Sequence, residues 1–196
     1  MVRGGPGNDL VYGGASRTYR GGQGFAKYMY GDEGDDQIWG SNRNDNEYMF
    51  GGEGNDVLYG GFLNDNEYIT GNDGDDIIYP ASEILVTDRV RGGKGDDLIN
   101  PVELEYDDAG TLITDLTDPL NQSVGSTADT NWQGGEGNDT IWGKYLPVGN
   151  QVYEGGNGDD TIYGAYEVTG GVYKIAGGGG KDFISTEFYK GLDQAD

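Results

Sequence analysis

The sequence predicts an all-β fold, a parallel β-solenoid with coils of about 20 residues. Three observations lead to this prediction. A glycine-rich stretch of nine residues recurs eight times, its eighth position is aliphatic in every copy, and the copies follow one another at a nearly constant spacing. Such a period is typical of repeat architectures, in which each unit buries its apolar face only against its neighbours.

The eight copies share a strict turn. The third copy reads "GGEGNDVLY", and the copies begin at Gly4, Gly31, Gly51, Gly71, Gly92, Gly134, Gly155 and Gly177. Their spacings are 27, 20, 20, 21, 42, 21 and 22 residues, and 42 is twice 21, so an insertion occupies one period. Positions one, two and four are nearly always Gly, position five is Asn or Asp in seven copies, and position six is Asp in all eight.

The end of each copy predicts a strand of three residues whose middle side chain points inward, because side chains alternate along a strand. That middle residue is Val11, Ile38, Leu58, Ile78, Ile99, Ile141, Ile162 or Ile184. The residues between copies predict a second strand after a degenerate turn, with Met49, Ile69, Val90, Trp132, Tyr153 and Ile175 pointing inward. Stacked coils then form two parallel sheets face to face, with strict turns on one edge and degenerate turns plus insertions on the other.

We expect one domain over residues 1–196, interrupted by an insertion at 101–133. The first part of the insertion, "VELEYDDAGTLITDLT", predicts a β-hairpin, because apolar alternation flanks a turn sequence. The remainder predicts a loop. No stretch predicts a helix.

Composition excludes several classes of function. The chain has no Cys and no His, which removes disulfides, thiolate sites and the commonest general base. A formal net charge of -23 opposes binding to nucleic acid, and no apolar run is long enough to span a membrane. Without His, Cys or a nucleophile motif we expect no catalytic residues and no enzyme activity.

The position-six aspartates should form a column along the strict edge. Adjacent strands lie about 4.8 Å apart, which stacks Asp9, Asp36, Asp56, Asp76, Asp97, Asp139, Asp160 and Asp182. Neighbouring carboxylates at that spacing repel by about 3 to 4 kcal/mol at an effective dielectric constant near 20. Because a domain is stable by only about 5 to 15 kcal/mol, the column requires a cation. Carboxylates and carbonyls suit a hard ion, and Ca²⁺ tolerates their loose geometry better than Mg²⁺ does.

The motif also resembles a known family. "GGEGNDVLY" and the other copies match the pattern G-G-x-G-x-D-x-aliphatic-x of the repeats-in-toxin (RTX) calcium-binding repeats. The resemblance implies a right-handed β-roll with several Ca²⁺ ions between successive turns, held by the position-six aspartates and by turn carbonyls. Those carbonyls would belong to the turn glycines, starting with the first glycine of each copy, and to the position-five residues Asn8, Asp35, Asn55, Asp75, Asp96, Asn138 and Asp159. It also implies export in an unfolded state and folding outside the cell.

The sequence departs from that family on the second edge, where the family has strict turns as well. Candidates for separate ions on this edge are Asp45, Glu47, Asp65 and Glu67. Lys181 in the last copy and the insertion should weaken the metal sites beside them. An ordinary Asx turn explains a single Asp equally well, but eight in register favour a metal.

Position nine is aromatic in six copies, at Tyr12, Trp39, Tyr59, Tyr79, Trp142 and Tyr163. These side chains should point outward and could form a surface that binds a polysaccharide or a protein. The alternative is that aromatic residues simply suit half-exposed strands.

We therefore expect an extracellular or cell-surface calcium-binding repeat protein with a structural or adhesive role, as an adhesin, S-layer or filament subunit. The alternative is an accessory module of a secreted enzyme or toxin, serving export, folding or polysaccharide attachment. Secretion would not use a cleaved N-terminal signal, because "MVRGGPGNDL" has no apolar stretch. Both ends of the sequence match the middle of a coil, which suggests end-to-end self-association or a longer parent chain.

Overall fold

A computed structural model describes residues 1–13, 27–40, 46–60, 67–80, 88–100, 129–143, 149–165 and 170–186. All regular structure in these ranges is β-strand, and the strands form two parallel sheets of eight strands each. The predicted β-solenoid is thus confirmed. Within the same ranges, no helix has the length and apolarity needed to cross a membrane.

Each coil contributes one long strand and one short strand. The long strands are β1 (Val2–Pro6), β3 (Lys27–Glu33), β5 (Glu47–Glu53), β7 (Glu67–Asp73), β9 (Asp88–Lys94), β11 (Thr130–Glu136), β13 (Gln151–Asn157) and β15 (Tyr173–Gly179). The short strands are β2 (Leu10–Tyr12), β4 (Gln37–Trp39), β6 (Val57–Tyr59), β8 (Ile77–Tyr79), β10 (Leu98–Ile99), β12 (Thr140–Trp142), β14 (Thr161–Tyr163) and β16 (Phe183–Ser185). The long strands extend through the first three positions of the motif, further than the short strands predicted from the sequence.

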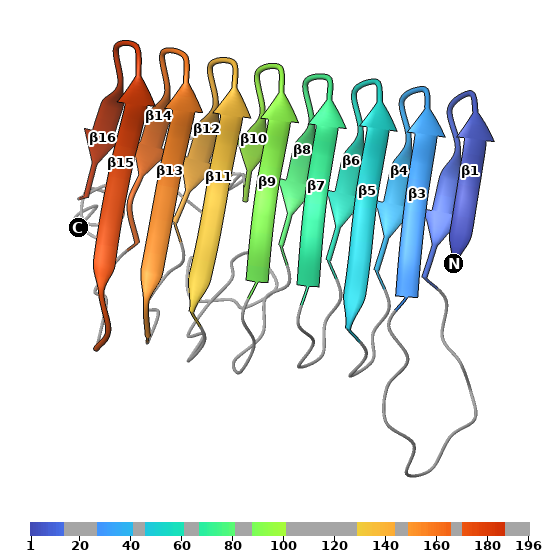
Figure 1. The fold of residues 1–196 in the computed structure, drawn as a ribbon, viewed down its shortest axis with the longest axis horizontal. Helices are drawn as coiled ribbons and strands as arrows, with labels where there is room; N and C mark the ends of the chain where they lie inside the picture. The colour runs from blue at the N-terminus through green and yellow to red at the C-terminus, as the bar shows by residue number, and fades with distance from the viewer. Residues whose placement is uncertain are drawn as a thin grey trace, which may run out of the picture.

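The strands stack in chain order. One sheet runs β1-β3-β5-β7-β9-β11-β13-β15, and the other runs β2 to β16 through the even-numbered strands (Figure 1). Equivalent residues pair between coils, as in Met29↔Met49 and Met49↔Ile69. In this register every inward side chain lies above its counterpart in the next coil. The register is strongly specified, because a slip of one residue would turn the apolar row outward.

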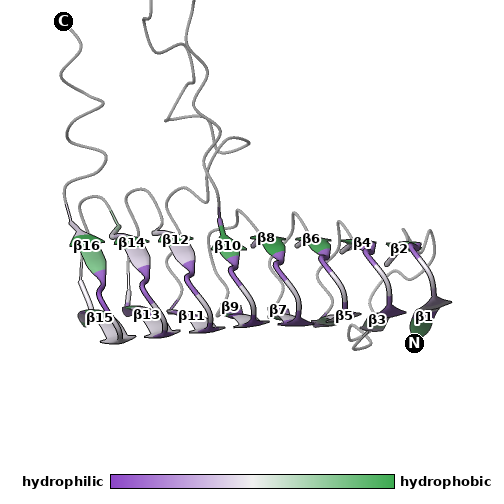
Figure 2. Cartoon of the chain, turned by 90° about the horizontal axis from the view of Figure 1, so that it is seen from above, coloured by the Kyte–Doolittle hydropathy of each residue, from purple (hydrophilic) through white to green (hydrophobic). Residues whose placement is uncertain are grey.

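The core consists of two rows of side chains, one from each sheet, and Figure 2 shows the two layers joined by hydrophilic turns. The inward residues predicted from the sequence are buried, from Val11 to Ile162 in the short strands and from Met49 to Tyr153 in the long ones. Ile175 is only partly buried and Ile184 is 44% exposed. Both belong to the last coil of the described residues, whose strands β15 and β16 lie at the ends of their sheets.

The predicted insertion at 101–133 is too long at its C-terminal end, since β11 begins at Thr130. Residues 101–128, including the predicted hairpin, lie outside the described residues. On either side of the insertion, β9 pairs directly with β11, and Ile99 pairs with Ile141. The two coils that flank the insertion are therefore adjacent in both sheets.

Candidate metal centre

The strict turns join each long strand to the following short strand, and all lie on one edge of the solenoid (Figure 1). Glycines at positions two and four have positive φ, for example 136° at Gly52 and 130° at Gly54. Two copies have Asp32 and Asn72 at position two, with φ of 84° and 83°. Asn and Asp tolerate this region better than other residues with a side chain. The turn sequence therefore follows from backbone sterics, which leave few alternatives at these two positions.

The position-six aspartates form the predicted column, and one carboxylate oxygen of each links two coils. Oδ1 of each Asp accepts a hydrogen bond from the backbone N–H of the Asp in the preceding coil. The donor–acceptor distances are 2.8 Å from Asp36 N to Asp56 Oδ1 and 2.8 Å from Asp56 N to Asp76 Oδ1. The same bond spans the insertion, at 2.9 Å from Asp97 N to Asp139 Oδ1. The column of aspartates is therefore continuous across the insertion, while the expected weakening of the metal sites beside it stays a prediction.

The other carboxylate oxygen of these residues is buried and has no hydrogen-bond partner in the structure. This holds for Oδ2 of Asp9, Asp36, Asp56, Asp76, Asp97, Asp139 and Asp160. A buried acceptor without a partner costs about 1 to 3 kcal/mol, and more when it is charged. Seven such atoms in register require a compensating group, either a proton on each carboxyl or a cation shared between coils.

The first glycine of each copy provides the space that these oxygens occupy. A Cβ atom added at Gly4 would lie 2.7 Å from Asp9 Oδ2 and 2.8 Å from the carbonyl oxygen of Gly31. A Cβ at Gly51 would be even closer to Asp56 Oδ2, and 2.5 Å from the carbonyl oxygen of Gly71. The carboxylate oxygen and the first carbonyl of the next coil thus border the same small space. Two acceptors with no donor between them are the surroundings in which a cation is favourable.

Burial raises the pKa of the aspartates in the middle of the column. Desolvation is the largest cause, opposed by the backbone hydrogen bond to Oδ1 and reinforced by neighbouring carboxylates. The pKa of Asp56 rises to about 7 and the pKa values of Asp76 and Asp97 to about 8. The pKa of Asp139 rises to about 6 for the same reason. Without a cation, protons therefore occupy part of the column near neutral pH, an alternative that the spacing of the charges alone did not indicate.

The position-five residues form a second ladder that runs in the opposite direction. Here the side-chain Oδ1 accepts from the backbone N–H of the following coil, at 3.0 Å from Asp35 N to Asn8 Oδ1 and 2.9 Å from Asn55 N to Asp35 Oδ1. The ladder continues through Asp75, Asp96, Asn138 and Asp159 to the backbone of Lys181. These side chains are exposed. Each therefore caps a neighbouring amide, which leaves its own carbonyl as its predicted contribution to a metal site.

Side chains by themselves do not complete a metal site. Nowhere in the described ranges do three or more His, Cys, Asp or Glu side chains gather closely enough to hold an ion. An ion on this edge would need backbone carbonyls besides the position-six carboxylates, and the structure places the first-glycine carbonyls beside Oδ2. An all-oxygen donor set of this kind fits Ca²⁺.

The last copy differs from the others. Asp182 is exposed in the last coil of the described residues, and its Oδ1 accepts from Asp160 N at 3.2 Å, the longest bond of the column. Lys181 at position five is exposed as well. The longest hydrogen bond of the column therefore lies in the copy that holds Lys181, while a weaker metal site there stays a prediction.

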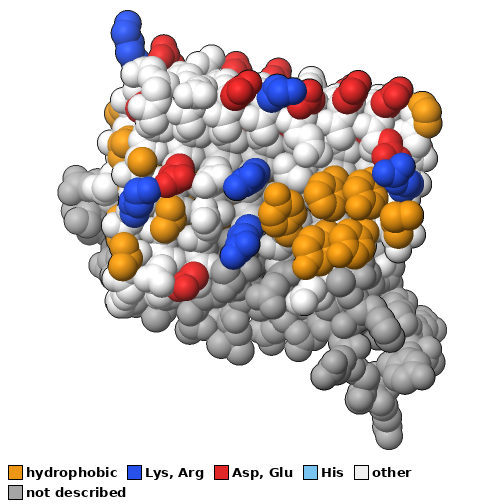
Figure 3. All heavy atoms as spheres, in the orientation of Figure 1, with side chains coloured by type: hydrophobic (Ala, Val, Ile, Leu, Met, Phe, Trp, Pro, Cys, Tyr) orange, Lys and Arg blue, Asp and Glu red, His pale blue; other side chains and the backbone are white. Residues whose placement is uncertain are grey.

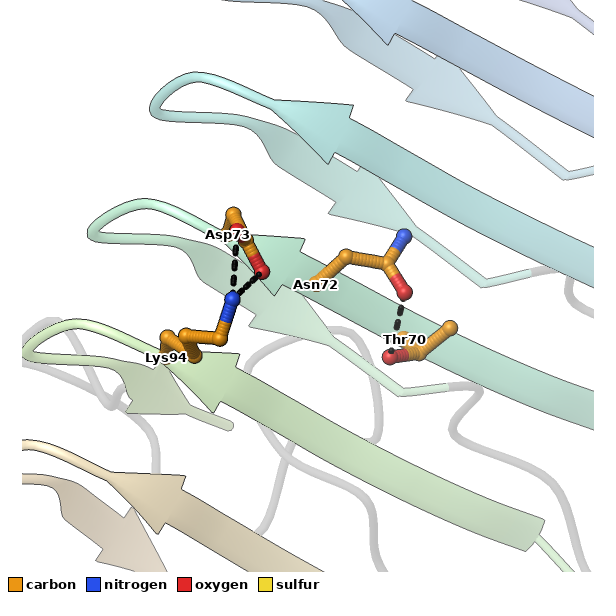
Figure 4. Close-up of polar contacts among 4 residues, drawn as sticks. All are labelled: Thr70, Asn72, Asp73 and Lys94. Atoms are coloured by element: carbon orange, nitrogen blue, oxygen red, sulfur yellow. Dashed lines mark hydrogen bonds and ion pairs between the residues drawn. The ribbon is translucent and has the colours of Figure 1, made fainter.

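Acidic residues at position three lie outside the column, on the exposed rim of the turn. In Figure 4, Lys94 Nζ donates to both carboxylate oxygens of Asp73, at 2.8 Å and 2.6 Å. The same view shows Thr70 Oγ1 donating to Asn72 Oδ1 at 3.4 Å, on the outer face of β7. The hydrogen bond to Asp73 raises the pKa of Lys94. One rim carboxylate is thus neutralised by a lysine, whereas the buried oxygens of the column have no such partner.

Ion binding at the second edge, where the degenerate turns lie, remains a prediction. Glu47 and Glu67 are buried and paired in register at the start of β5 and β7, and both have polar or electrostatic contacts. Asp45 and Asp65 lie outside the described residues. In later coils the same inward row holds Thr130 and Gln151, with 2.8 Å between Thr130 Oγ1 and Gln151 Oε1.

The position-nine aromatics form a stack on the outside of the short-strand sheet. Ring centroids are 3.9 Å apart for Trp39 and Tyr59 and 4.9 Å apart for Tyr59 and Tyr79. Tyr12 is exposed at the open end of this stack, and Trp142 stacks on Tyr163 at 5.7 Å after the insertion. Asn100 interrupts the row: it is buried and its Nδ2 donates to the carbonyl oxygen of Trp142 at 2.8 Å. The role of the position-nine aromatic residues as a binding surface stays a prediction.

Sequence reasoning missed a second set of aromatic side chains, on the outer face of the long-strand sheet. Tyr28 stacks on Tyr48 with centroids 4.7 Å apart, and Tyr30 stacks on Phe50 at 4.9 Å. The signal was the recurrence of "KYMY", "EYMF" and "EYIT" before successive copies. In each of these, the residues on either side of the inward Met or Ile point outward.

Comparison with known proteins places these repeats in a family. The family model described as RTX calcium-binding nonapeptide repeat matches residues 1–17, 28–46, 63–79, 87–100, 125–144 and 148–165, more than half of the chain. A search of curated proteins and a search of solved structures found no match. The matched segments contain six of the eight strict turns described above. The chain therefore belongs to the RTX calcium-binding nonapeptide repeat family.

Proposed function

We propose that this protein is an extracellular structural or adhesive module whose folding is driven by Ca²⁺ along the strict edge. One observation carries the proposal: the register of buried Oδ2 atoms without partners, each beside a glycine that leaves room for it. The ions would be held by the position-six carboxylates and by turn carbonyls. The family match supports calcium as the ion.

Folding and binding are coupled in this proposal, because the sites exist only when coils are stacked. An ion that binds the folded state alone stabilises it by mass action. The thin core, the 39 glycines and the net charge of -23 all weaken the calcium-free state. Extracellular calcium modules operate at about 10⁻⁴ to 10⁻³ M, so a chain of this kind would stay largely unfolded inside a cell and fold after export.

The role itself would be non-catalytic. A sequence without His or Cys lacks the commonest groups for acid–base and nucleophilic chemistry. The acidic residues of the strict edge belong to the position-six column, to the position-five ladder that accepts backbone hydrogen bonds, or to the exposed position-three rim, so none is left as a separate catalytic candidate. A rigid rod that forms only outside the cell suits a surface adhesin, an S-layer or a filament.

A calcium titration from chelated protein, followed by circular dichroism and light scattering, tests the proposal. We expect a cooperative change from coil to strand, and a rise in scattering if copies assemble. The same change without scattering would favour the accessory module of a secreted enzyme or toxin. Changing Asp56 and Asp76 to Ala should raise the calcium concentration needed for folding, whereas Asp35→Asn on the exposed ladder should not. A folded protein with no bound metal and no response to chelator would contradict the proposal.

A further inference from the structure

The outer face of the long-strand sheet carries two rows of side chains that differ from the rest of the acidic surface. We call them the aromatic–arginine face. By strand register, one row holds Tyr28, Tyr48, Tyr68 and Arg89, and the other holds Arg3, Tyr30, Phe50, Thr70 and Arg91. Figure 3 shows hydrophobic side chains gathered over β3, β5 and β7, with basic side chains beside them.

The stacking of the rings determines what this face presents to solvent. Tyr28 and Tyr48 are nearly parallel, at 9°, and so are Tyr30 and Phe50, at 8°. Rings stacked along the solenoid axis cover one another's faces, so that mainly their edges remain accessible. The edge of an aromatic ring is the positive part of its quadrupole, and each tyrosine adds a hydroxyl group that can donate a hydrogen bond. The face therefore favours a partner rich in oxygen atoms.

Two arginines extend the same preference to anions. Arg89 and Arg91 are exposed, and neither forms an ion pair with any described residue. They lie two residues apart on one side of β9, which separates them by about 7 Å along the strand. From β5 to β11 the two rows contain no Asp or Glu. At the other end, Arg3 lies 4.8 Å from the centroid of the Tyr30 ring and 3.5 Å from Asp32.

We propose that the aromatic–arginine face binds a polysaccharide that carries carboxylate groups, such as a polymer of uronic acids. Guanidinium groups bind carboxylates through two parallel hydrogen bonds, and ring edges and phenols suit the hydroxyl groups of sugars. The rows repeat at the spacing of the coils over five strands, so the face is linear and suits a repeating chain. Protein partners usually insert a few large side chains into pockets, which these rows of stacked rings do not offer.

The net charge of the protein does not prevent this binding. The Debye length is about 8 Å at physiological ionic strength, so a carboxylate at Arg89 responds mainly to charges close to it. Acidic groups of the same face are already engaged: Asp32 pairs with Arg3, and Glu154, in the row of Arg91, pairs with Lys174. This inference rests on the proposed function, because it supplies the ligand of an adhesive module.

Calorimetric titration of the calcium-folded protein with short oligogalacturonates tests the inference. The fully methyl-esterified oligomer is the matched neutral probe, since it has the same backbone without the charge. We expect the acid form to bind and the ester to bind at least about tenfold more weakly, because charged hydrogen bonds are lost. Circular dichroism on the same samples reports whether the coils are folded.

Variants locate the site. Arg89→Gln and Arg91→Gln should each lose about tenfold in affinity, while Lys181→Gln on the strict edge changes the net charge equally and should bind as the parent does. Tyr48→Thr should weaken binding several-fold, while Tyr163→Thr on the opposite sheet should not.

Four results would overturn the inference while leaving calcium-driven folding intact. They are equal binding of the ester, equal loss in the lysine variant, loss in Tyr163→Thr instead of Tyr48→Thr, and no binding by folded protein. If either arginine variant instead abolishes association between copies of the chain, the face is a protein interface and the polysaccharide is refuted. A chain that calcium does not fold would refute the proposed function itself.

Discussion

Replacing Asp56 by Asn separates the two tasks of the column, which are hydrogen bonding between coils and holding a charge. Asn keeps the Oδ1 atom that accepts from Asp36 N at 2.8 Å. It replaces the buried, unpartnered Oδ2 with an NH₂ group near the carbonyl oxygen of Gly71. The change is nearly isosteric, so the packing of the turn should survive.

The expected gain in calcium-free stability follows from the raised pKa. Burial moves the pKa of Asp56 from 3.8 to about 7. Each pKa unit corresponds to 1.36 kcal/mol, so ionised Asp56 destabilises the calcium-free fold by about 4 kcal/mol at pH 8. Asn removes that cost. The gain should fall to about 1.5 kcal/mol at pH 5 and to about 0.5 kcal/mol at pH 4, since the carboxyl group is then increasingly protonated in the unfolded state as well.

Calcium should reverse the order of the two proteins. A neutral amide is a weaker ligand for Ca²⁺ than a carboxylate, and affinity depends on the charge of the ligand set. We therefore expect Asp56→Asn to need about tenfold more calcium for folding at pH 8. The variant would thus be more stable than the parent in chelator and less stable at limiting calcium.

The assay is circular dichroism at several pH values, with folding in chelator induced by trimethylamine N-oxide, which favours burial. A second series replaces the osmolyte with calcium. The control is Asp35→Asn, which removes the same charge from an exposed position where other copies have Asn. Its effect should stay within about 0.5 kcal/mol. If Asp56→Asn matches this control at every pH and calcium concentration, the reasoning about the buried column is wrong.

Three further outcomes follow from the same structure. Gly155→Ala should raise the calcium midpoint of folding, because its Cβ would displace Asp160 Oδ2. Gly179→Ala is the control, because its Cβ would meet only Asn157 Oδ1 at 3.3 Å, and it should leave the midpoint unchanged. Equal effects of the two variants would contradict the inference that the first glycine of each copy leaves room for Oδ2. In chelator the parent should lose stability as pH rises from about 4 to about 8, because four aspartates have folded pKa values above their ordinary value of 3.8, namely Asp56, Asp76, Asp97 and Asp139. Osmolyte-induced folding, monitored by circular dichroism at each pH, measures this stability. A rise in stability over the same pH range would contradict the prediction. Met49→Ala should cost about 2 to 5 kcal/mol, measured by urea unfolding in saturating calcium, since Met49 is fully buried. A loss below about 1 kcal/mol would show that the inward rows contribute little to stability.

The opposing ladders explain why calcium can act on the whole rod. Position six links each coil to the one before it and position five links it to the one after it. A coil that loses its register breaks both links at once. If Ca²⁺ binds along the column as proposed, an ion at one site should therefore favour its neighbours, as expected when stability is a sum over units and their interfaces.

Much of this protein was determined by its sequence alone. Eight copies of one motif at a constant period indicate stacked coils, because only glycine, Asn and Asp accept the backbone of the turn and only one alternate position per strand faces the core. The aspartate column, the inward residues and the choice of a hard cation all follow from that repetition. Local chemistry repeated at a fixed period predicts tertiary contacts, since each residue meets its own counterpart in the next coil.

Only the tertiary structure decided how the two oxygens of each carboxylate divide their tasks. Oδ1 of Asp56 faces an amide and Oδ2 faces the space beside Gly51, a difference that depends on the stagger between coils. The structure also showed that the insertion leaves the stack intact, because the pairing of Ile99 with Ile141 joins residues far apart in the chain. It placed Arg89 beside Tyr68 on an outer face. The outward aromatic residues recur in the sequence, but Arg89 and Arg91 do not belong to that recurrence, so their alignment with the aromatic rows became visible only when the register of the sheet was known.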